Sequence, residues 1–430
     1  MKQVISVLSL LILIAACGRQ TDGDPAADLD SLVSEYLFLE LSMSRHDPGH
    51  VDAYFGPTDI RDAATAAQLS LDDVEARARR LRTRFEDRKA DLADSLDAMR
   101  LDGLINRSVA LETRIALKNG QTLPFDEESR RLFGVVAPDH DAAYFRAVLD
   151  DIDMLLGGEG PLSGRVDAFR NRFVIPPDRL GAVFDAAIAE CRRRTLLYIH
   201  LPQNESFRIE YVNDKPWSGY NWYQGNGQSL IQVNTDLPIY ISRAVDLGCH
   251  EGYPGHHTFN ALLEKNLVRD KGWLEFSLYP LFSPQSLIAE GSGNYGIDLA
   301  FPGDERNAFE KSVLFPLAGL DTSEADHYYA LLGLLAKLDY AGNEAARDYL
   351  NGTIDRDQAV QWLVDFALMS PDRARQRTDF FDTYRSYVIN YNLGKDIVRD
   401  YVERGDADLG ERWRRFEILL SSPMTAADLH

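Results

Sequence analysis

The feature that most constrains this chain is the segment Cys249–His257, where three histidines flank a proline and a glycine. Helical patterns lie on both sides of the segment, so a helix must be interrupted at Pro254 and Gly255. Proline cannot donate a hydrogen bond to the carbonyl four residues earlier, and glycine adopts backbone angles that other residues avoid. The histidines are therefore predicted to lie at a helix distortion, and such distortions are frequent at functional sites.

His250 and Glu251 begin a pattern close to His-Glu-x-x-His, in which two histidines on one helical face bind zinc and the glutamate acts as a base. Here the second histidine comes two or three residues late. On an unbroken helix His257 would lie about 10 Å along the axis from His250, too far for both rings to reach one ion. If the Pro–Gly pair bulges out, His256 takes the second position. We predict His250 and His256 as ligands, with His257 as the less favoured alternative.

A zinc site of this kind needs a third protein ligand. Glu290 lies in a predicted helix, 284–300, and glycines follow it at positions 291 and 293. Small residues there would let this helix approach the histidine helix closely. Glu290 is the predicted third ligand of a Zn²⁺ ion. Glu251, which is adjacent to a ligand in the chain, is the predicted general base.

Composition excludes some classes of partner. The net charge of -21 argues against binding to nucleic acid or to acidic lipid headgroups, and the hydrophobic content of 45% is typical of a globular protein. Beyond Cys17 the chain has only Cys191 and Cys249. Two cysteines are no disulfide framework, although they could pair in an oxidising compartment.

The N-terminus has the pattern of an export signal, with Lys2 followed by an apolar run over 4–16 and then Cys17. The run is shorter than the roughly 20 residues that span a membrane. Residues 14–17 resemble the lipobox of bacterial lipoproteins, whose cysteine is acylated; an ordinary cleaved signal is the alternative. We predict a signal peptide over 1–16 and a tether over 17–30. The expected product is an exported lipoprotein of the cell envelope, facing the periplasm, with the outer membrane as the expected location and Cys17 as its only membrane contact.

The rest of the chain is predicted to be mainly α-helical with one small sheet. An N-terminal helical region over 31–200 precedes a catalytic region over 201–430, although the boundary could equally lie within one domain. The aromatic stretch 217–223 fits either the core of the sheet or the rim of a cleft. The predicted strands are 207–212 and 230–234, and the predicted later helices are 239–251, 256–266, 284–300, 324–350, 356–369 and 381–404.

The motifs resemble a bacterial family of unassigned function that is grouped with the gluzincin zinc metallopeptidases and is distantly like the thermostable carboxypeptidase family. The family's marks are His-Glu-x-x-Pro-Gly-His, Glu-Gly-x-x-x-Tyr and Tyr-x-x-Gly, which correspond to residues 250–256, 290–295 and 391–394. Relatives usually carry Trp-Ala where this chain has Ser292 and Gly293. The resemblance implies a gluzincin-like helical body with a small β-sheet beside the active-site helix.

The third motif implies that Tyr391 donates a hydrogen bond to the developing oxyanion. The alternative is structural, because Tyr391 also belongs to a helical stripe of the kind that usually packs in a core. Tyr295 is interpreted as a packing residue or as a residue that supports a metal ligand. The remaining histidines lack a partner pattern and are interpreted as structural; they are His46, His50, His140, His200 and His327.

These patterns together predict a zinc-dependent hydrolase that cleaves peptides in the cell envelope. Strand 230–234, which is close in sequence to the zinc helix, is the candidate to align an extended peptide by backbone pairing. Two alternatives remain open: a zinc-binding lipoprotein without catalysis, and a metal hydrolase of a non-peptide amide or ester.

Overall fold

A computed structural model describes residues 25–90, 96–215 and 217–429. The predicted signal peptide, Cys17 and most of the tether lie outside the described residues. Helix α1 (Pro25–Met43) begins inside the segment 17–30 that the sequence predicts as tether. The buried side chains of Leu32 and Tyr36 anchor this helix in the core, and helix formation is cooperative, so the helical conformation extends back over the polar residues.

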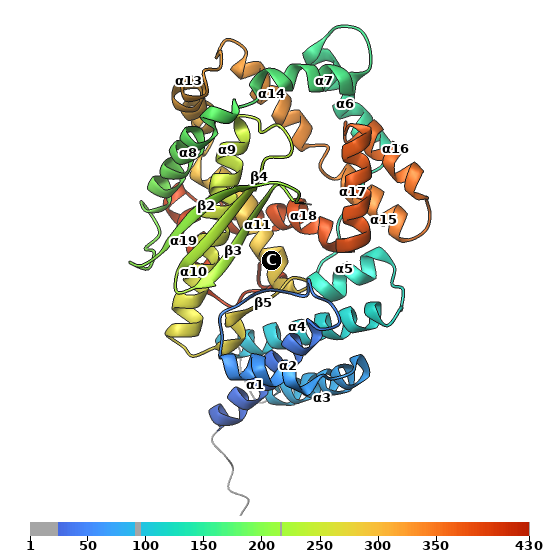
Figure 1. Ribbon diagram of the computed structural model, residues 1–430, viewed down its shortest axis with the longest axis vertical. Helices are drawn as coiled ribbons and strands as arrows, with labels where there is room; N and C mark the ends of the chain where they lie inside the picture. The colour runs from blue at the N-terminus through green and yellow to red at the C-terminus, as the bar shows by residue number, and fades with distance from the viewer. Residues whose placement is uncertain (1–24, 91–95, 216, 430) are drawn as a thin grey trace, which may run out of the picture.

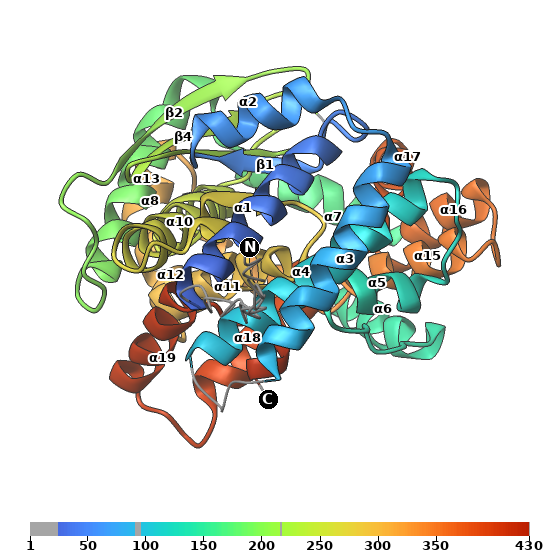
Figure 2. The same ribbon diagram turned by 90° about the horizontal axis from the view of Figure 1, so that it is seen from below.

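The N-terminal third is helical, as predicted, and its first helices form one end of the molecule (Figures 1 and 2). Helix α3 starts with a capping box, in which the Ser70 side chain accepts from the Asp73 amide and the Asp73 side chain accepts from the Ser70 amide. Apolar faces of α1, α3 and α4 meet in one hydrophobic cluster. The elements are α1, β1 (Val51–Tyr54), α2 (Thr58–Ala67), α3 (Leu71–Lys89), α4 (Leu96–Lys118), α5 (Phe125–Phe133), α6 (Ala142–Leu156) and α7 (Leu162–Arg170).

A three-stranded sheet follows helix α8 (Leu180–Thr195) and consists of β2 (Ser206–Val212), β3 (Gly219–Gly225) and β4 (Gln228–Asn234). Strand β4 is central: it pairs with β2 in parallel and with β3 in antiparallel orientation. Both predicted strands are present. The aromatic stretch is a third strand, β3, whose alternate side chains are buried while Trp222 faces solvent.

A second sheet was not predicted. Strand β1 pairs in antiparallel orientation with β5 (Leu278–Pro280), which brings residues about 225 positions apart in the chain side by side. Strands of three and four residues are too short to show the alternation that marks a strand in sequence. The pairing places β1 next to the segment that leads into the helix carrying Glu290.

The rest of the chain is helical. The predicted helices 324–350 and 381–404 are each interrupted, by a turn over 337–340 and by a short 3₁₀ segment, η7 (Arg385–Val388). Arg385 has a positive φ of 53°, which a continuous helix does not allow. The helices are α9 (Ser242–Leu247), α10 (His256–Leu263), α11 (Pro284–Ala300), α12 (Glu305–Phe309), α13 (Phe315–Ala318), α14 (Ala325–Ala336), α15 (Ala341–Leu350), α16 (Arg356–Phe366), α17 (Pro371–Tyr384), α18 (Ile389–Glu403) and α19 (Leu409–Ser421).

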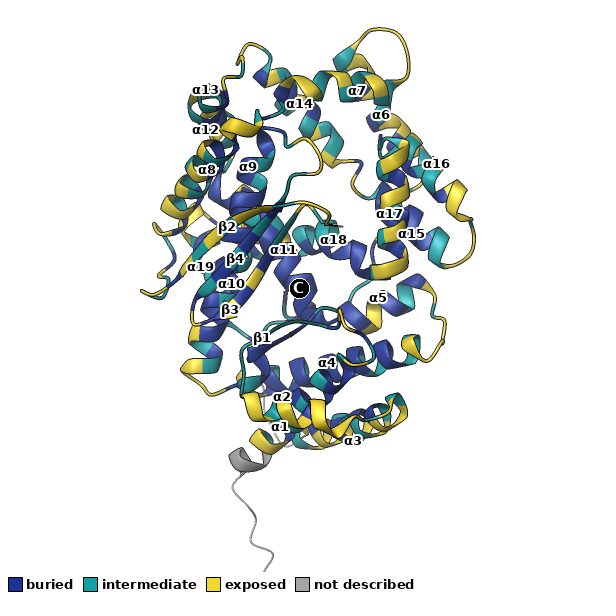
Figure 3. Ribbon diagram, viewed as in Figure 1, coloured by how far each residue is buried: buried dark blue, intermediate teal, exposed yellow. Residues whose placement is uncertain are grey.

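The largest hydrophobic core crosses residue 200. Val183 and Phe184 of α8 pack in one cluster with Ile231 of β4 and Phe259 of α10. Figure 3 shows α9, α10 and α11 among the most buried helices. The predicted fold class, a mainly α-helical body with a small sheet, is confirmed. Among the described residues, no helix combines the length and the apolar character needed to cross a membrane.

Candidate metal centre

The helix is interrupted at the Pro–Gly pair. Helix α9 continues into a π-helical turn, η3 (Gly248–Gly252), and α10 begins at His256. The Gly255 amide donates to the carbonyl of Cys249 at 2.9 Å. A Cβ atom on Gly255 would lie 1.8 Å from the carbonyl oxygen of His250, so the turn tolerates only glycine there. The wide turn brings His250 and His256 to the same side of the helix.

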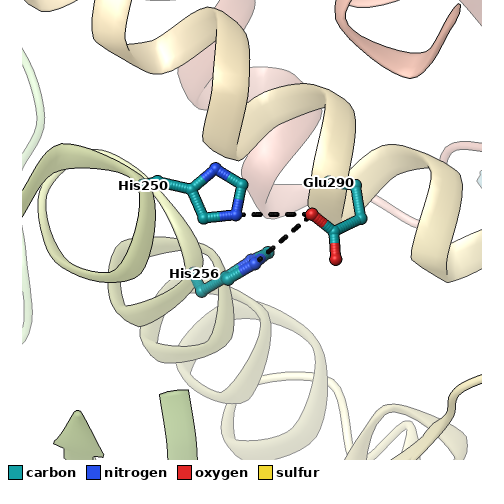
Figure 4. Close-up of side chains that lie close together, drawn as sticks. All are labelled: His250, His256 and Glu290. Atoms are coloured by element: carbon teal, nitrogen blue, oxygen red, sulfur yellow. Dashed lines mark ion pairs between the residues drawn. The ribbon is translucent and has the colours of Figure 1, made fainter. Parts of the chain in front are cut away.

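His250 of η3, His256 of α10 and Glu290 of α11 converge (Figure 4). The Glu290 Oε2 atom lies 3.3 Å from Nε2 of His250 and 3.9 Å from Nε2 of His256. The two imidazole centroids are 4.5 Å apart. Both imidazoles are slightly exposed, with 13% and 14% of their side-chain surface accessible, so a small molecule can reach them.

The arrangement of these three groups fits a zinc ion. Zinc binds histidine nitrogen and carboxylate oxygen at about 2.1 Å in tetrahedral geometry, which places ligand atoms about 3.4 Å apart. The distances from Glu290 Oε2 to the two Nε2 atoms, 3.3 and 3.9 Å, lie on either side of that value. The Oε2 atom of Glu290 is also buried without a hydrogen-bond partner, an arrangement that is costly unless something else satisfies it. Two imidazoles and one carboxylate form a donor set that zinc enzymes use.

Neighbouring residues fix the position of each of these groups. The ring of His250 lies against Gly293 of α11, where a Cβ atom would be 2.9 Å from Nδ1. Gly291, which was expected to face the histidine helix as well, instead meets Gly394 of α18. Tyr387 donates to Oε1 of Glu290 at 2.8 Å. The sequence places Tyr387 in an aromatic stripe without marking it as a site residue, because a stripe does not show which tyrosine faces the carboxylate.

The charges in the centre favour neutral His256 and ionised Glu290. Burial lowers the pKa of His256 to about 4, and the positive charge of His250 acts in the same direction. Burial alone would raise the pKa of Glu290, but His250, His256 and Tyr387 together lower it. A neutral imidazole and a carboxylate are the protonation states that bind a metal.

Glu251 lies beside these groups without joining them. Its side chain is buried next to β3, where its Oε1 atom is 3.0 Å from the position that a Cβ on Gly219 would take. The Asn221 side chain donates to the Glu251 carbonyl at 2.7 Å and ties η3 to β3. Burial raises the pKa of Glu251 to about 7, with a further contribution from the charge of Glu290, against the opposing effects of His250 and Arg243.

Tyr391, the predicted oxyanion donor, packs on the tyrosine that contacts Glu290. Its ring packs on Tyr387 with centroids 5.8 Å apart, and its main-chain carbonyl accepts from Asn294 at 2.9 Å. Burial raises the pKa of the Tyr391 phenol, and the charge of Glu290 adds to this effect. The tyrosine that donates to a carboxylate of the centre is therefore Tyr387, and the ring of Tyr391 packs against it.

Asp52 of β1 is a further acidic residue near the centre. Tyr220 of β3 donates a hydrogen bond to its carboxylate. Burial raises the pKa of Asp52 to about 7, and the negative charges of Glu290 and Glu251 act in the same direction. No sequence signal indicates Asp52, because it comes close only through the pairing of β1 with β5.

His257 points away from this group into a closed polar network. Its Nδ1 atom is 2.8 Å from Ser229 Oγ and its Nε2 atom is 3.0 Å from Glu205 Oε2. Tyr253 donates to the same Glu205 oxygen at 2.5 Å. Of the remaining histidines, His50 bonds Glu40, and His46 and His327 bond main-chain carbonyls.

A disulfide anchors the centre to α8. Cys191 and Cys249, for which the sequence left pairing open, are bonded with their Cα atoms 5.6 Å apart. Cys249 immediately precedes His250, so the bond fixes the histidine turn to a neighbouring helix.

Tyr295 donates to Glu403 at 3.1 Å, which agrees with a packing role.

No protein-family model matches this chain, and no curated protein matches it. Solved structures of similar fold include the following two. One is a lipoprotein candidate from Colwellia psychrerythraea, with 14% identity over 94% of this chain and 75% of its own length, and a TM-score of 0.50. The other is an M32 carboxypeptidase from Deinococcus radiodurans R1, with 14% identity over 94% of both chains, and a TM-score of 0.50. At this identity the likenesses show the fold alone.

Proposed function

We propose that this chain is a zinc-dependent peptidase whose metal is held by His250, His256 and Glu290. The observation that carries the proposal is the convergence of two imidazoles on a buried carboxylate oxygen that has no hydrogen-bond partner. A helical fold similar to that of a carboxypeptidase supports the choice of peptide bonds over other substrates.

A zinc ion at these residues would supply a water of lowered pKa, near 7, and would polarise the scissile carbonyl. Glu251 is the proposed general base. Its pKa of about 7 suits proton transfer at neutral pH, because a base is most effective when its pKa is near the working pH. Glu251 would then pass the proton to the leaving amine. Tyr391 is the proposed donor to the oxyanion.

The sheet offers an edge for an extended peptide, although at a different strand from the one expected. Strand β4, which contains the predicted segment 230–234, is paired on both sides and has no free backbone groups along either edge. Strand β3 is an edge strand of this sheet, and its Asn221 contacts the backbone of Glu251. We therefore assign peptide alignment to β3.

The deciding experiment compares Glu251→Gln with Glu290→Gln. Glu251→Gln removes the base but no ligand, so zinc content should stay near one per chain while peptide hydrolysis falls by roughly 10²–10⁴-fold. Glu290→Gln should lose zinc and activity together. A Glu251→Gln protein with full zinc and normal turnover would contradict the mechanism, and wild-type protein that binds zinc but cleaves no peptide in a library would favour the non-catalytic alternative.

We also propose that the chain is an exported lipoprotein anchored through Cys17, since its N-terminal pattern agrees with the description of the similar structure from Colwellia psychrerythraea. Cys17→Ser should appear as soluble protein or as uncleaved precursor. Membrane fractionation with immunoblotting separates these outcomes from processed protein that stays in the membrane fraction, which would contradict the anchor.

A further inference from the structure

Asp52 of β1 lies at an irregularity in the pairing of β1 with β5. Its neighbours Val51 and Ala53 pair with consecutive residues of β5, so Asp52 is one extra residue between two pairs. A bulge of this kind redirects the side chain of the extra residue, and bulges are frequent beside functional sites. The redirected side chain of Asp52 reaches Tyr220 of β3, whose hydroxyl donates to its carboxylate.

The Asp52 carboxylate has a hydrogen-bond donor but no cationic partner. In the part of the chain that the structure describes, Tyr220 is the only group that hydrogen-bonds this carboxylate, and no basic side chain forms a salt bridge with it. Asp47, by contrast, pairs with Arg114 and Lys118. Asp52 is only partly exposed. A partly buried carboxylate has lost hydration that no ion pair replaces, so a cationic ligand would be favoured beside it.

Aromatic rings extend from Asp52 along β3. The ring centroid of Tyr220 lies 4.5 Å from that of Trp222 and 5.5 Å from that of Trp217. Tyr220 and Trp222 alternate with buried residues of β3, so they share the face of the strand that is turned away from the core. The faces of such rings attract cations, and an arginine can stack on a ring while its guanidinium bonds a carboxylate. An unpaired carboxylate beside these rings is therefore suited to an ammonium or a guanidinium group.

The Asp52 carboxylate lies beside the proposed path of the peptide. Strand β1 contacts β3, the edge strand to which peptide alignment is assigned (Figure 3). Tyr220 directly follows Gly219, where a Cβ atom would lie 3.0 Å from Oε1 of Glu251, the proposed base. Asp52 and the base are therefore next to consecutive residues of one strand. Burial raises the pKa of Asp52 to about 7, and a cation beside it would lower this pKa and keep the carboxylate ionised.

We propose that Asp52 and the ring of Tyr220 bind a positively charged group of the peptide substrate close to the scissile bond. The inference rests on the proposed peptidase function and adds to it the class of substrate, which is a peptide with a lysine, an arginine or a free α-amine near the cleaved bond. A basic side chain and an N-terminal amine offer the same charge and the same kind of donor, and the peptides of the test separate them.

The test uses zinc-loaded full-length protein and pairs of peptides that differ at one position, where one carries lysine and the other carries norleucine, which lacks the amine. The position is moved along the peptide, and each peptide is prepared both N-acylated and with a free α-amine. Wild-type protein should cleave the charged member with the higher kcat/KM, either for lysine at one position or for the free α-amine.

Asp52→Asn keeps the shape of the side chain and an acceptor for Tyr220 but removes the charge. It should lower kcat/KM for the preferred charged peptide by about 10-fold, the low end for a charged hydrogen bond, because the site is partly exposed. It should leave the uncharged peptide within about threefold. Tyr220→Leu, which removes the ring but not the carboxylate, should lower the preference by about two- to fivefold.

Glu210→Gln is the matched control, since Glu210 lies on β2 of the same sheet and its carboxylate is 3.5 Å from Arg208. This change also removes one negative charge, but it should leave the preference for the charged peptide as in wild type. Equal losses on charged and uncharged peptides in Asp52→Asn would indicate a structural role and overturn the proposal. Equal cleavage of charged and uncharged peptides by wild type, at every position and at the N-terminus, would also overturn it.

A binding measurement separates this inference from the proposed function. Zinc-loaded Glu251→Gln protein should bind the charged peptide more tightly than its uncharged counterpart by isothermal titration calorimetry, and the additional Asp52→Asn change should remove the preference. If no peptide is cleaved by wild type while this preference is present, the peptidase proposal fails and recognition of the cation stands. If cleavage occurs without the preference, the peptidase stands and the role of Asp52 fails.

Discussion

Two consecutive histidines of α10 have opposite surroundings. His256 faces His250 and Glu290, three groups that converge around a buried oxygen without a hydrogen-bond partner. His257 is fully buried, and both of its ring nitrogens have partners, Ser229 and Glu205. Neighbouring residues on a helix point about 100° apart, so one step along the chain separates the two environments.

The difference shows how a binding site can be distinguished from a structural network among buried polar residues. In the network around His257 each polar group has a partner within the protein, which is what stabilisation of a fold requires. In the cluster around His256 the ligand atoms face one another, and one acceptor is left without a donor. Polar groups that converge without hydrogen-bonding one another are candidates to bind a ligand. Polar groups whose hydrogen bonds are all made within the protein are candidates to stabilise the fold.

The largest effect is expected for metal binding. His256→Ala removes a predicted ligand, so zinc affinity should fall by more than the roughly 10–100-fold that follows the loss of a residue behind a ligand. His257→Ala should retain about one zinc per chain. Metal analysis of both proteins after dialysis measures the contrast. Full zinc in His256→Ala together with zinc loss in His257→Ala would reverse the assignment.

The next largest effect is on the free energy of unfolding and is expected for the network around His257. Glu205→Gln removes a buried carboxylate that accepts from Tyr253 and pairs with His257 and Arg192. We expect unfolding to become easier by about 2 kcal/mol, the typical effect of losing hydrogen bonds to a charged group, with zinc content unchanged. Denaturant titration with parallel metal analysis tests this. A variant of wild-type stability that has lost zinc would show that the network serves the metal centre.

A smaller effect on zinc affinity is expected for Tyr387, which contacts both Glu290 and the ring of Tyr391. Tyr387→Phe removes the donor to Oε1 of Glu290 but keeps the ring, so zinc affinity should fall by about 10–100-fold while the fold stays intact. Competition with a chelator of known affinity gives the shift. Tyr384→Phe is the control, because among the described residues Tyr384 forms no hydrogen bond with Glu290, and its affinity should match wild type.

The smallest effect is the pH dependence of the His257 network. Burial alone would raise the pKa of Glu205, but hydrogen bonds from His257, Tyr253 and Arg192 together lower it. Because the folded-state pKa is lowered, the stabilisation is fully present above the unfolded pKa of about 4.3 and is lost as pH falls through the folded value. The difference in Tm between wild type and Glu205→Gln should therefore be constant from pH 8 to pH 6 and shrink below pH 4. A difference that persists unchanged in acid would exclude this origin.

The sequence indicated much of the candidate centre because its residues are local. His250, Pro254, Gly255 and His256 lie within seven positions, so proline and glycine chemistry alone predicted the interruption that brings two histidines together. Glu290 was recognised from the glycines that follow it. The aromatic segment 217–223 was left undecided, because exposed and buried aromatic residues alternate in an edge strand much as they do at the rim of a cleft.

What the sequence by itself determined is the mainly helical body with a small sheet, and the residues that could hold a metal, because periodicity, helix breakers and ligand spacing are properties of short segments. The tertiary structure decided which groups meet across long separations. It placed Tyr387 on Glu290, Tyr220 on Asp52 and Cys191 on Cys249. Such contacts depend on how helices and strands pack, and no local pattern records which distant side chain will fill a given position.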